Sequence, residues 1–133
     1  MFGHLRRHAI RWFAVVLIGA GLVSFPATVG AKQGDVIRAG GCTGASDWKL
    51  KLSPENGSIE VEFEVDQNVN NKTWNVTLKR NGNVFWQGQK TTKAPSGSFA
   101  VRKLANNGAG TDAFVARAVN AQTGEVCRGT ASF

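Results

Sequence analysis

Hydrophobic and polar residues alternate strictly over residues 58–66, which read Ser-Ile-Glu-Val-Glu-Phe-Glu-Val-Asp. Ile59, Val61, Phe63 and Val65 fall on one side of the pattern, and glutamates fall on the other. A period of two is typical of a strand with one buried and one solvated face. A helix would distribute the four apolar residues around its axis. This stretch therefore predicts an antiparallel sheet packed on one face.

The same alternation recurs along the rest of the chain. It predicts further strands in residues 48–52, 74–78, 84–87, 98–104, 113–120 and 125–133. Asn81-Gly82 lies between two of these runs, which predicts a tight hairpin. In the run 98–104 we expect a shift of register before Leu104. In the run 113–120 we expect Phe114 and its period-two neighbours to face inward, because the opposite choice would bury Arg117.

Seven short strands at spacings of about 8–12 residues predict an all-β fold, namely an antiparallel immunoglobulin-like or fibronectin-like sandwich of about seven strands. A small barrel is the alternative. Trp74 on the third predicted strand resembles the core tryptophan of immunoglobulin domains. Cys42 and Cys127 depart from that family, because they fall at the first and last predicted strands rather than the second and sixth.

Residues 1–31 have the pattern of a secretory signal peptide. The basic start contains Arg6, Arg7 and Arg11 and no acid, and residues 12–25 carry no charge. This apolar run is shorter than the roughly 20 residues that span a bilayer, and small residues follow it. Cleavage and secretion to the extracellular space are the expectation, and an uncleaved membrane anchor is the alternative.

Two further segments complete the expected organisation. Residues 32–41 are rich in glycine and unpatterned, which predicts a flexible leader or a loosely attached edge. Residues 42–133 form the predicted β-sandwich domain.

The net charge of the chain narrows the classes of partner that we expect. The chain has 16 Lys+Arg against 9 Asp+Glu, a net charge of +7. Three of the arginines lie in the predicted signal peptide, so 13 basic residues and a net charge of +4 remain after it. This removes the main support for nucleic-acid binding. The expected partners are extracellular or cell-envelope polymers or proteins, anionic lipid being a further alternative, with no stable membrane span after cleavage.

The two cysteines, Cys42 and Cys127, predict one disulfide in a small secreted domain. A redox-active or metal-bound pair is the alternative, but it needs close spacing or histidine partners. Both histidines, His4 and His8, lie in the predicted signal peptide. A chain without histidine lacks the base of a Ser-His-Asp or Cys-His site and the commonest zinc ligand. We therefore expect no enzyme, cofactor or metal.

Two groups of carboxylates offer alternatives to a chain without catalysis or metal, namely a hydrolase site and a calcium site. Glu60, Glu62 and Glu64 share a solvated strand face, which would allow a glycosidase-like pair. The same stripe is also expected on any solvated strand that faces cross-strand cations, here Lys49, Lys51 or Lys79. Asp66 and Asp112 flank loops and would suit calcium, although turn-forming aspartates are the favoured explanation.

The predicted ligand-binding residues are Phe85, Trp86 and Gln87. In an alternating strand only one of the two aromatic residues faces the core. The other is then exposed beside polar neighbours, where it would stack on a sugar or contact a partner. Packing against a neighbouring loop is the alternative.

The layout of the chain resembles small, uncharacterised secreted proteins of actinobacteria. The resemblance rests on Cys42-Thr43-Gly44, Trp48, the Glu-Val-Glu-Phe-Glu-Val strand, the Ala94–Phe99 segment and Cys127-Arg128-Gly129. It implies a secreted β-sandwich and no particular activity. The function we expect is that of a secreted, non-catalytic binding or interaction module. The alternatives are an extracellular small-ligand carrier with a cavity between its sheets, and a carboxylate-dependent hydrolase.

Overall fold

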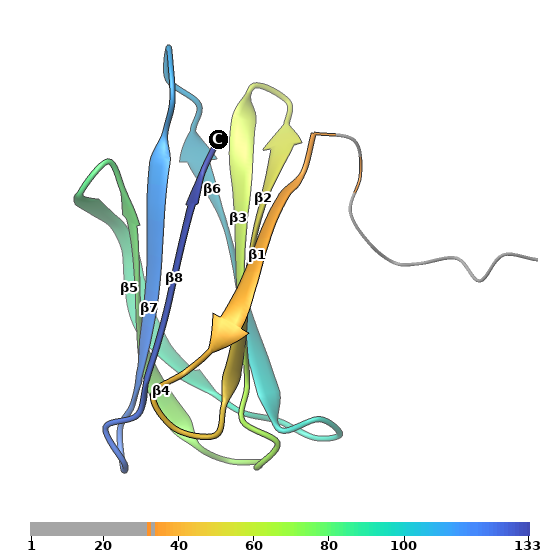
Figure 1. Cartoon of the computed structure of the whole chain (residues 1–133), viewed down its shortest axis with the longest axis vertical. Helices are drawn as coiled ribbons and strands as arrows, with labels where there is room; N and C mark the ends of the chain where they lie inside the picture. The colour runs from red at the N-terminus through yellow and green to blue at the C-terminus, as the bar shows by residue number, and fades with distance from the viewer. Residues whose placement is uncertain (1–31, 33) are drawn as a thin grey trace, which may run out of the picture.

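The computed structural model describes residues 32 and 34–133, and the predicted signal peptide lies outside them. Two four-stranded antiparallel sheets pack face to face, with no helix in the described part of the chain (Figure 1). Sheet A has the strand order β1-β2-β3-β6 and sheet B the order β5-β4-β7-β8. The strands are β1 (Val36–Gly41), β2 (Asp47–Glu55), β3 (Ser58–Asp66), β4 (Thr73–Arg80), β5 (Asn83–Thr91), β6 (Ser98–Asn106), β7 (Ala113–Asn120) and β8 (Val126–Ser132).

The connections from β2 onward are those of an immunoglobulin-like sandwich. Strands β2, β3 and β6 take the places of A, B and E, while β5, β4, β7 and β8 take those of C′, C, F and G. The chain crosses between the sheets after β3, β5 and β6. The predicted all-β sandwich is confirmed, with eight strands in place of about seven.

The additional strand is β1, in the segment for which the sequence predicted a leader or a loose edge. It pairs with β2 from Val36↔Leu52 to Gly41↔Asp47. Four of its six residues are exposed, so it has little of the hydrophobic alternation by which strands are recognised. Backbone pairing and the packing of Gly40 beneath the Trp48 ring hold it instead.

The core lies between the sheets and consists of the inward positions of both. Trp74 is fully buried, and its indole N–H donates to Gln67 Oε1 at 3.0 Å. The predicted inward faces of residues 58–66 and 113–120 are confirmed. The largest fully buried apolar side chains are Trp74, Phe63, Phe114, Leu50, Leu52, Ile59 and Leu78. These side chains occupy the space between the sheets.

The expected register shift before Leu104 is wrong. The pairing of β3 with β6 runs without interruption from Ser58↔Asn106 to Asp66↔Ser98. Leu104 is therefore on the solvent face and 62% exposed, and Lys103 takes the inward position. The shift was expected because alternation alone puts a lysine inside. At the edge of a sheet an inward lysine is tolerated, and it discourages pairing with other chains.

The predicted disulfide is confirmed. Cys42, just after β1, is bonded to Cys127 in β8 across 85 positions of sequence. Strands β1 and β8 are edge strands of opposite sheets and run beside each other (Figure 1). The bond therefore connects the two sheets along one open edge of the sandwich.

Candidate functional site

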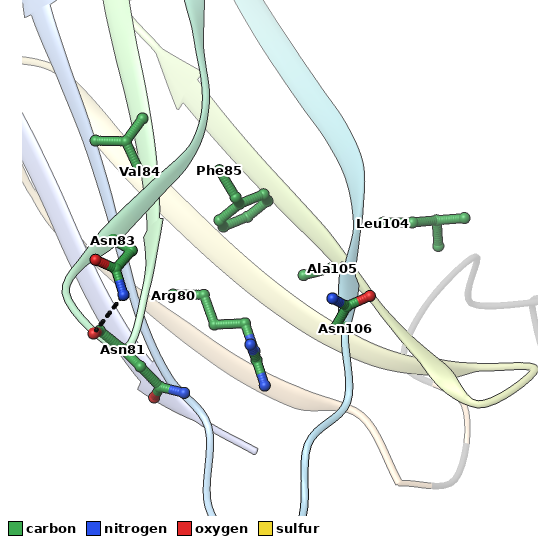
Figure 2. Close-up of a pocket in the computed structure, with 8 residues that line it drawn as sticks. All are labelled: Arg80, Asn81, Asn83, Val84, Phe85, Leu104, Ala105 and Asn106. Carbon is green, nitrogen blue, oxygen red and sulfur yellow. Dashed lines mark hydrogen bonds between the residues drawn. The ribbon is translucent and has the colours of Figure 1, made fainter.

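A pocket of about 340 Å³ opens at the other edge of the sandwich, between β5 and β6. Its lining residues are Arg80, Asn81, Asn83, Val84, Phe85, Leu104, Ala105 and Asn106. Figure 2 shows the Phe85 ring and the Arg80 side chain between the two strands, whereas the side chains of Val84 and Leu104 point away from that space. The interior of the pocket is thus an aromatic ring, a guanidinium and a group of carboxamides.

The β4–β5 hairpin shapes one wall of this pocket. Asn81 and Gly82 have φ angles of 49° and 81°, as a two-residue type I′ turn requires. Just beyond the turn, Leu78 pairs with Trp86 while Lys79 pairs with Val84. Phe85 is the extra residue of this β-bulge.

The bulge corrects the prediction that only one of the two aromatic residues faces inward. Because two residues of the bulged strand oppose one position of β4, the alternation is interrupted at Phe85. Both Phe85 and Trp86 are half-buried as a result. The Phe85 ring meets Phe114 edge to face, with centroids 6.1 Å apart.

Asp112 anchors the guanidinium of Arg80. The Arg80 Nη2–Asp112 Oδ1 distance is 2.6 Å, and Asp112 is only 2% exposed. The carboxylate also accepts hydrogen bonds from Asn81 Nδ2 at 3.0 Å and from the Gly108 N–H at 2.9 Å. Burial acts to raise the pKa of Asp112, but these donors and the guanidinium together hold it below its ordinary value. Asp112 is therefore an anion whenever the protein is near neutral pH.

The ion pair with Asp112 does not use the Nε–H of Arg80. Its Nε is buried and has no hydrogen-bond partner within residues 32 and 34–133. A buried donor without a partner is uncommon in folded proteins. Since Asp112 neutralises the guanidinium, Arg80 gives the pocket a polar wall without a net positive charge. Together with three carboxamides and an aromatic ring, it suits a neutral ligand rich in hydroxyl groups.

The structure separates the three residues that the sequence grouped as one site. Phe85 lines the pocket. Trp86 lies beside it, with Lys103 Nζ 5.0 Å from the ring centroid and Gly88 against the ring edge. Gln87 is exposed and pairs with Thr77, on the opposite face of the strand. Arg80, which lines the pocket from β4, was missed, and only the Asn81-Gly82 turn signal pointed to this end of the sandwich.

The glutamate stripe, formed by Glu60, Glu62 and Glu64, lies among cations on the outer face of sheet A. Glu64 lies 3.9 Å from Lys49 Nζ, and Glu62 lies 3.8 Å from Lys51 Nζ and 3.0 Å from Arg102 Nε. The last contact is electrostatic, because Glu62 Oε2 accepts no hydrogen bond. The expected cross-strand cations are thus confirmed for Lys49 and Lys51.

Two expectations about the stripe need correction. Lys79 is in sheet B and does not face the glutamates. Glu62 is buried rather than solvated, at 7% exposed, because the long side chains of Lys51 and Arg102 cover it.

The two aspartates considered for calcium lie apart. Asp66 is exposed and accepts a hydrogen bond from the Asn68 N–H at 3.0 Å, an Asx-type turn. Asp112 forms an ion pair with Arg80. No group of three or more His, Cys, Asp or Glu side chains in the described part of the chain is placed to hold a metal ion.

Comparisons with protein-family models, curated proteins and solved structures found no match to this chain. Among the described residues there is no helix long and apolar enough to cross a membrane.

Proposed function

We propose that this protein is a secreted, non-catalytic binding module whose ligand site is the pocket between β5 and β6. The observation that carries the proposal is that Phe85, three asparagines and an Arg80 guanidinium neutralised by Asp112 line one pocket. The ligand class it suits is a small neutral polyhydroxyl group, such as the end of an extracellular glycan. Pockets that hold small molecules commonly measure about 300–1,000 Å³, so this one suits one or two sugar rings.

Secretion is supported by the disulfide, because such bonds persist in oxidising, extracellular compartments. It is also supported by the signal-peptide pattern of residues 1–31. A surface site is favoured over a carrier cavity between the sheets, since large apolar side chains occupy the inter-sheet space. A carboxylate-dependent hydrolase is less well supported, because Glu62 and Glu64 face cross-strand cations.

The test is a titration of the ¹⁵N-labelled protein with glucose, galactose and N-acetylglucosamine, followed by NMR. We expect saturable shift changes in the Arg80 Nε–H signal and in the side-chain amides of the pocket asparagines. Asn106→Ala should weaken binding, since Asn106 is exposed at the rim and its removal leaves the fold intact. Gln87→Ala is the matched control on the other face of β5 and should leave binding unchanged. If none of the three sugars shifts these signals, the proposed ligand class is wrong.

A further inference from the structure

The charges of this protein are divided between its two sheets. Six of the nine acidic residues lie in β2 and β3 of sheet A. The four strands of sheet B contain no aspartate or glutamate. They contain five basic residues, namely Lys79, Arg80, Lys90, Arg117 and Arg128.

Three of these cations converge on the outer face of sheet B. Lys79, Arg117 and Arg128 are all exposed and line one hollow of about 390 Å³, together with Thr77, Gly82 and Val115. We call this surface the basic face. Arg117 lies directly opposite Arg128 on β8 and opposite Thr77 on β4. Lys79 lies diagonally from Arg117, opposite Val115, so the three cations form an oblique row across three adjacent strands.

None of the three cations is neutralised within the described residues. The ion pairs there involve Lys32, Lys49, Lys51, Arg80 and Arg102, and the acids they use lie in or beside sheet A, apart from Asp112. Like charges placed directly opposite on neighbouring strands destabilise a sheet. The Arg117–Arg128 pair therefore has an electrostatic cost that a bound anion would offset.

We propose that the basic face binds an anionic extracellular polysaccharide through sulfate or phosphate groups repeated along its chain. Guanidinium groups match such oxyanions with two parallel hydrogen bonds. Neighbouring strands are about 4.8 Å apart, so the row from β4 to β8 spans roughly 10 Å. That length exceeds a single oxyanion and suits successive charged groups of a polymer lying across the strands.

Two other anionic ligands fit the basic face less well. A lipid surface is held by cations together with inserted apolar side chains, whereas the only apolar side chain in the hollow, Val115, is half-buried. A free phosphate ion would be served by one or two of the cations and would leave the remainder of the row unpaired. The basic face is also separate from the pocket between β5 and β6. Polysaccharide binding at the basic face and sugar binding in the pocket can therefore be tested independently.

The test measures binding to heparin, a sulfated polysaccharide, over a range of salt concentrations. We expect the double variant Arg117→Gln/Arg128→Gln to weaken binding about tenfold or more, and to reduce the slope of log K against log salt by about two. The matched control is Lys32→Gln/Lys49→Gln, which removes the same charge from exposed ion pairs beside sheet A. It should leave affinity within about twofold, since these lysines lie away from the basic face and are paired with Glu55 and Glu64.

Several outcomes would overturn the assignment. Equal weakening in both double variants would mean that only the net charge matters, and no binding of heparin near 50 mM salt would exclude the polymer. Full competition by millimolar inorganic phosphate would indicate a single-ion site. Stronger binding to vesicles of anionic lipid would favour a membrane. The melting temperature of Arg117→Gln/Arg128→Gln should not fall, because the substitution removes a repulsive pair, so loss of binding cannot be attributed to unfolding.

Discussion

At the scale of single residues, Asp112 organises the polar end of the sandwich. Its carboxylate receives the Arg80 guanidinium and the Asn81 carboxamide, and its backbone N–H and C=O both bond to Phe133 at the C-terminus. The β4–β5 hairpin, the β6–β7 connection and the end of β8 therefore meet at one buried anion. The geometry of the proposed sugar pocket depends on this anion, because it fixes the direction of Arg80.

The pKa of Asp112 leads to a prediction about stability and pH. A carboxylate whose folded-state pKa is below its unfolded value, about 3.9, stabilises the fold above that unfolded value and loses this contribution as pH falls through the folded pKa. Asp112→Asn should therefore lower the free energy of unfolding at pH 7. The difference from the wild type should shrink as pH falls below about 4. Urea unfolding at both pH values measures it, and a difference independent of pH would show that the charge is not the cause.

Glu62 illustrates how a residue can differ from its sequence pattern. Its position in the alternation puts it on the solvent face, and that is where its strand presents it. It is nevertheless buried, since Lys51 and Arg102 from the strands on either side lie over it. Long basic side chains cover neighbours in this way because their aliphatic stems prefer to be out of water.

At the scale of secondary-structure elements, β5 is the strand that departs most from regular geometry. Its bulge turns two consecutive aromatic residues toward the space between the sheets. The Trp86 ring then lies so close to Gly88 that an added Cβ would be 2.7 Å from Cζ2. Lys103 covers the ring from β6. The edge between β5 and β6 is thus closed by one aromatic side chain, and the pocket opens next to it.

We expect Gly88→Ala to displace the Trp86 ring. The substitution should cost about 1–3 kcal/mol of stability, as overpacking typically does, and should change the tryptophan fluorescence. The double variant Trp86→Leu/Gly88→Ala tests the cause, because the cost of the alanine should largely disappear once the ring is gone. Equal costs in the two backgrounds would mean that the glycine is needed for its backbone and not for the ring.

At the scale of the whole molecule, the two open edges of the sandwich are closed differently. The edge between β5 and β6 relies on side chains, chiefly Trp86 and Lys103. The edge between β1 and β8 is closed covalently by Cys42–Cys127. Glu125 adds to it by accepting hydrogen bonds from the backbone and hydroxyl of Ser46, at 2.9 and 2.8 Å. The proposed ligand pocket is at the edge without the covalent link.

Removing the disulfide should reduce the stability of the whole domain. Cys42→Ser/Cys127→Ser opens a loop of 85 positions, and the loss of a native disulfide from a small domain typically costs about 2–5 kcal/mol. Urea unfolding with and without reductant measures the effect. The reduced wild type and the double variant should have the same midpoint. A midpoint unaffected by reductant would contradict the stabilising role.

Charge distribution also belongs to this scale. The sequence shows a modest positive excess, and the fold concentrates it. Glu55, Glu62 and Glu64 are paired with cations along sheet A, whereas Lys79, Arg117 and Arg128 lie together on sheet B. Two surfaces of different chemistry result, a locally neutral polar pocket at the β5–β6 edge and a basic face. They suit a protein that contacts a polymer through one surface and a terminal sugar through the other.

Features that depend on neighbours along the chain could be predicted from the sequence. Period-two alternation predicted the inward faces of β3 and β7, Asn81-Gly82 predicted the hairpin, and two cysteines predicted their own pairing. Each of these follows from local backbone preference or from simple counting, so no knowledge of the partner strand was needed. Phe85 is a conspicuous aromatic residue in a polar strand, and it lines the pocket.

Features that depend on the register between strands distant in the sequence could not be predicted without the fold. The pairing of Arg80 with Asp112, the cover over Glu62 and the opposition of Arg117 and Arg128 all join residues of different strands or loops. The bulge at Phe85 shows the same limit at short range, because alternation along β5 does not show where its register on β4 shifts. Alternation shows which side of its own strand a residue takes, but the residues it meets there depend on the order and register of the strands.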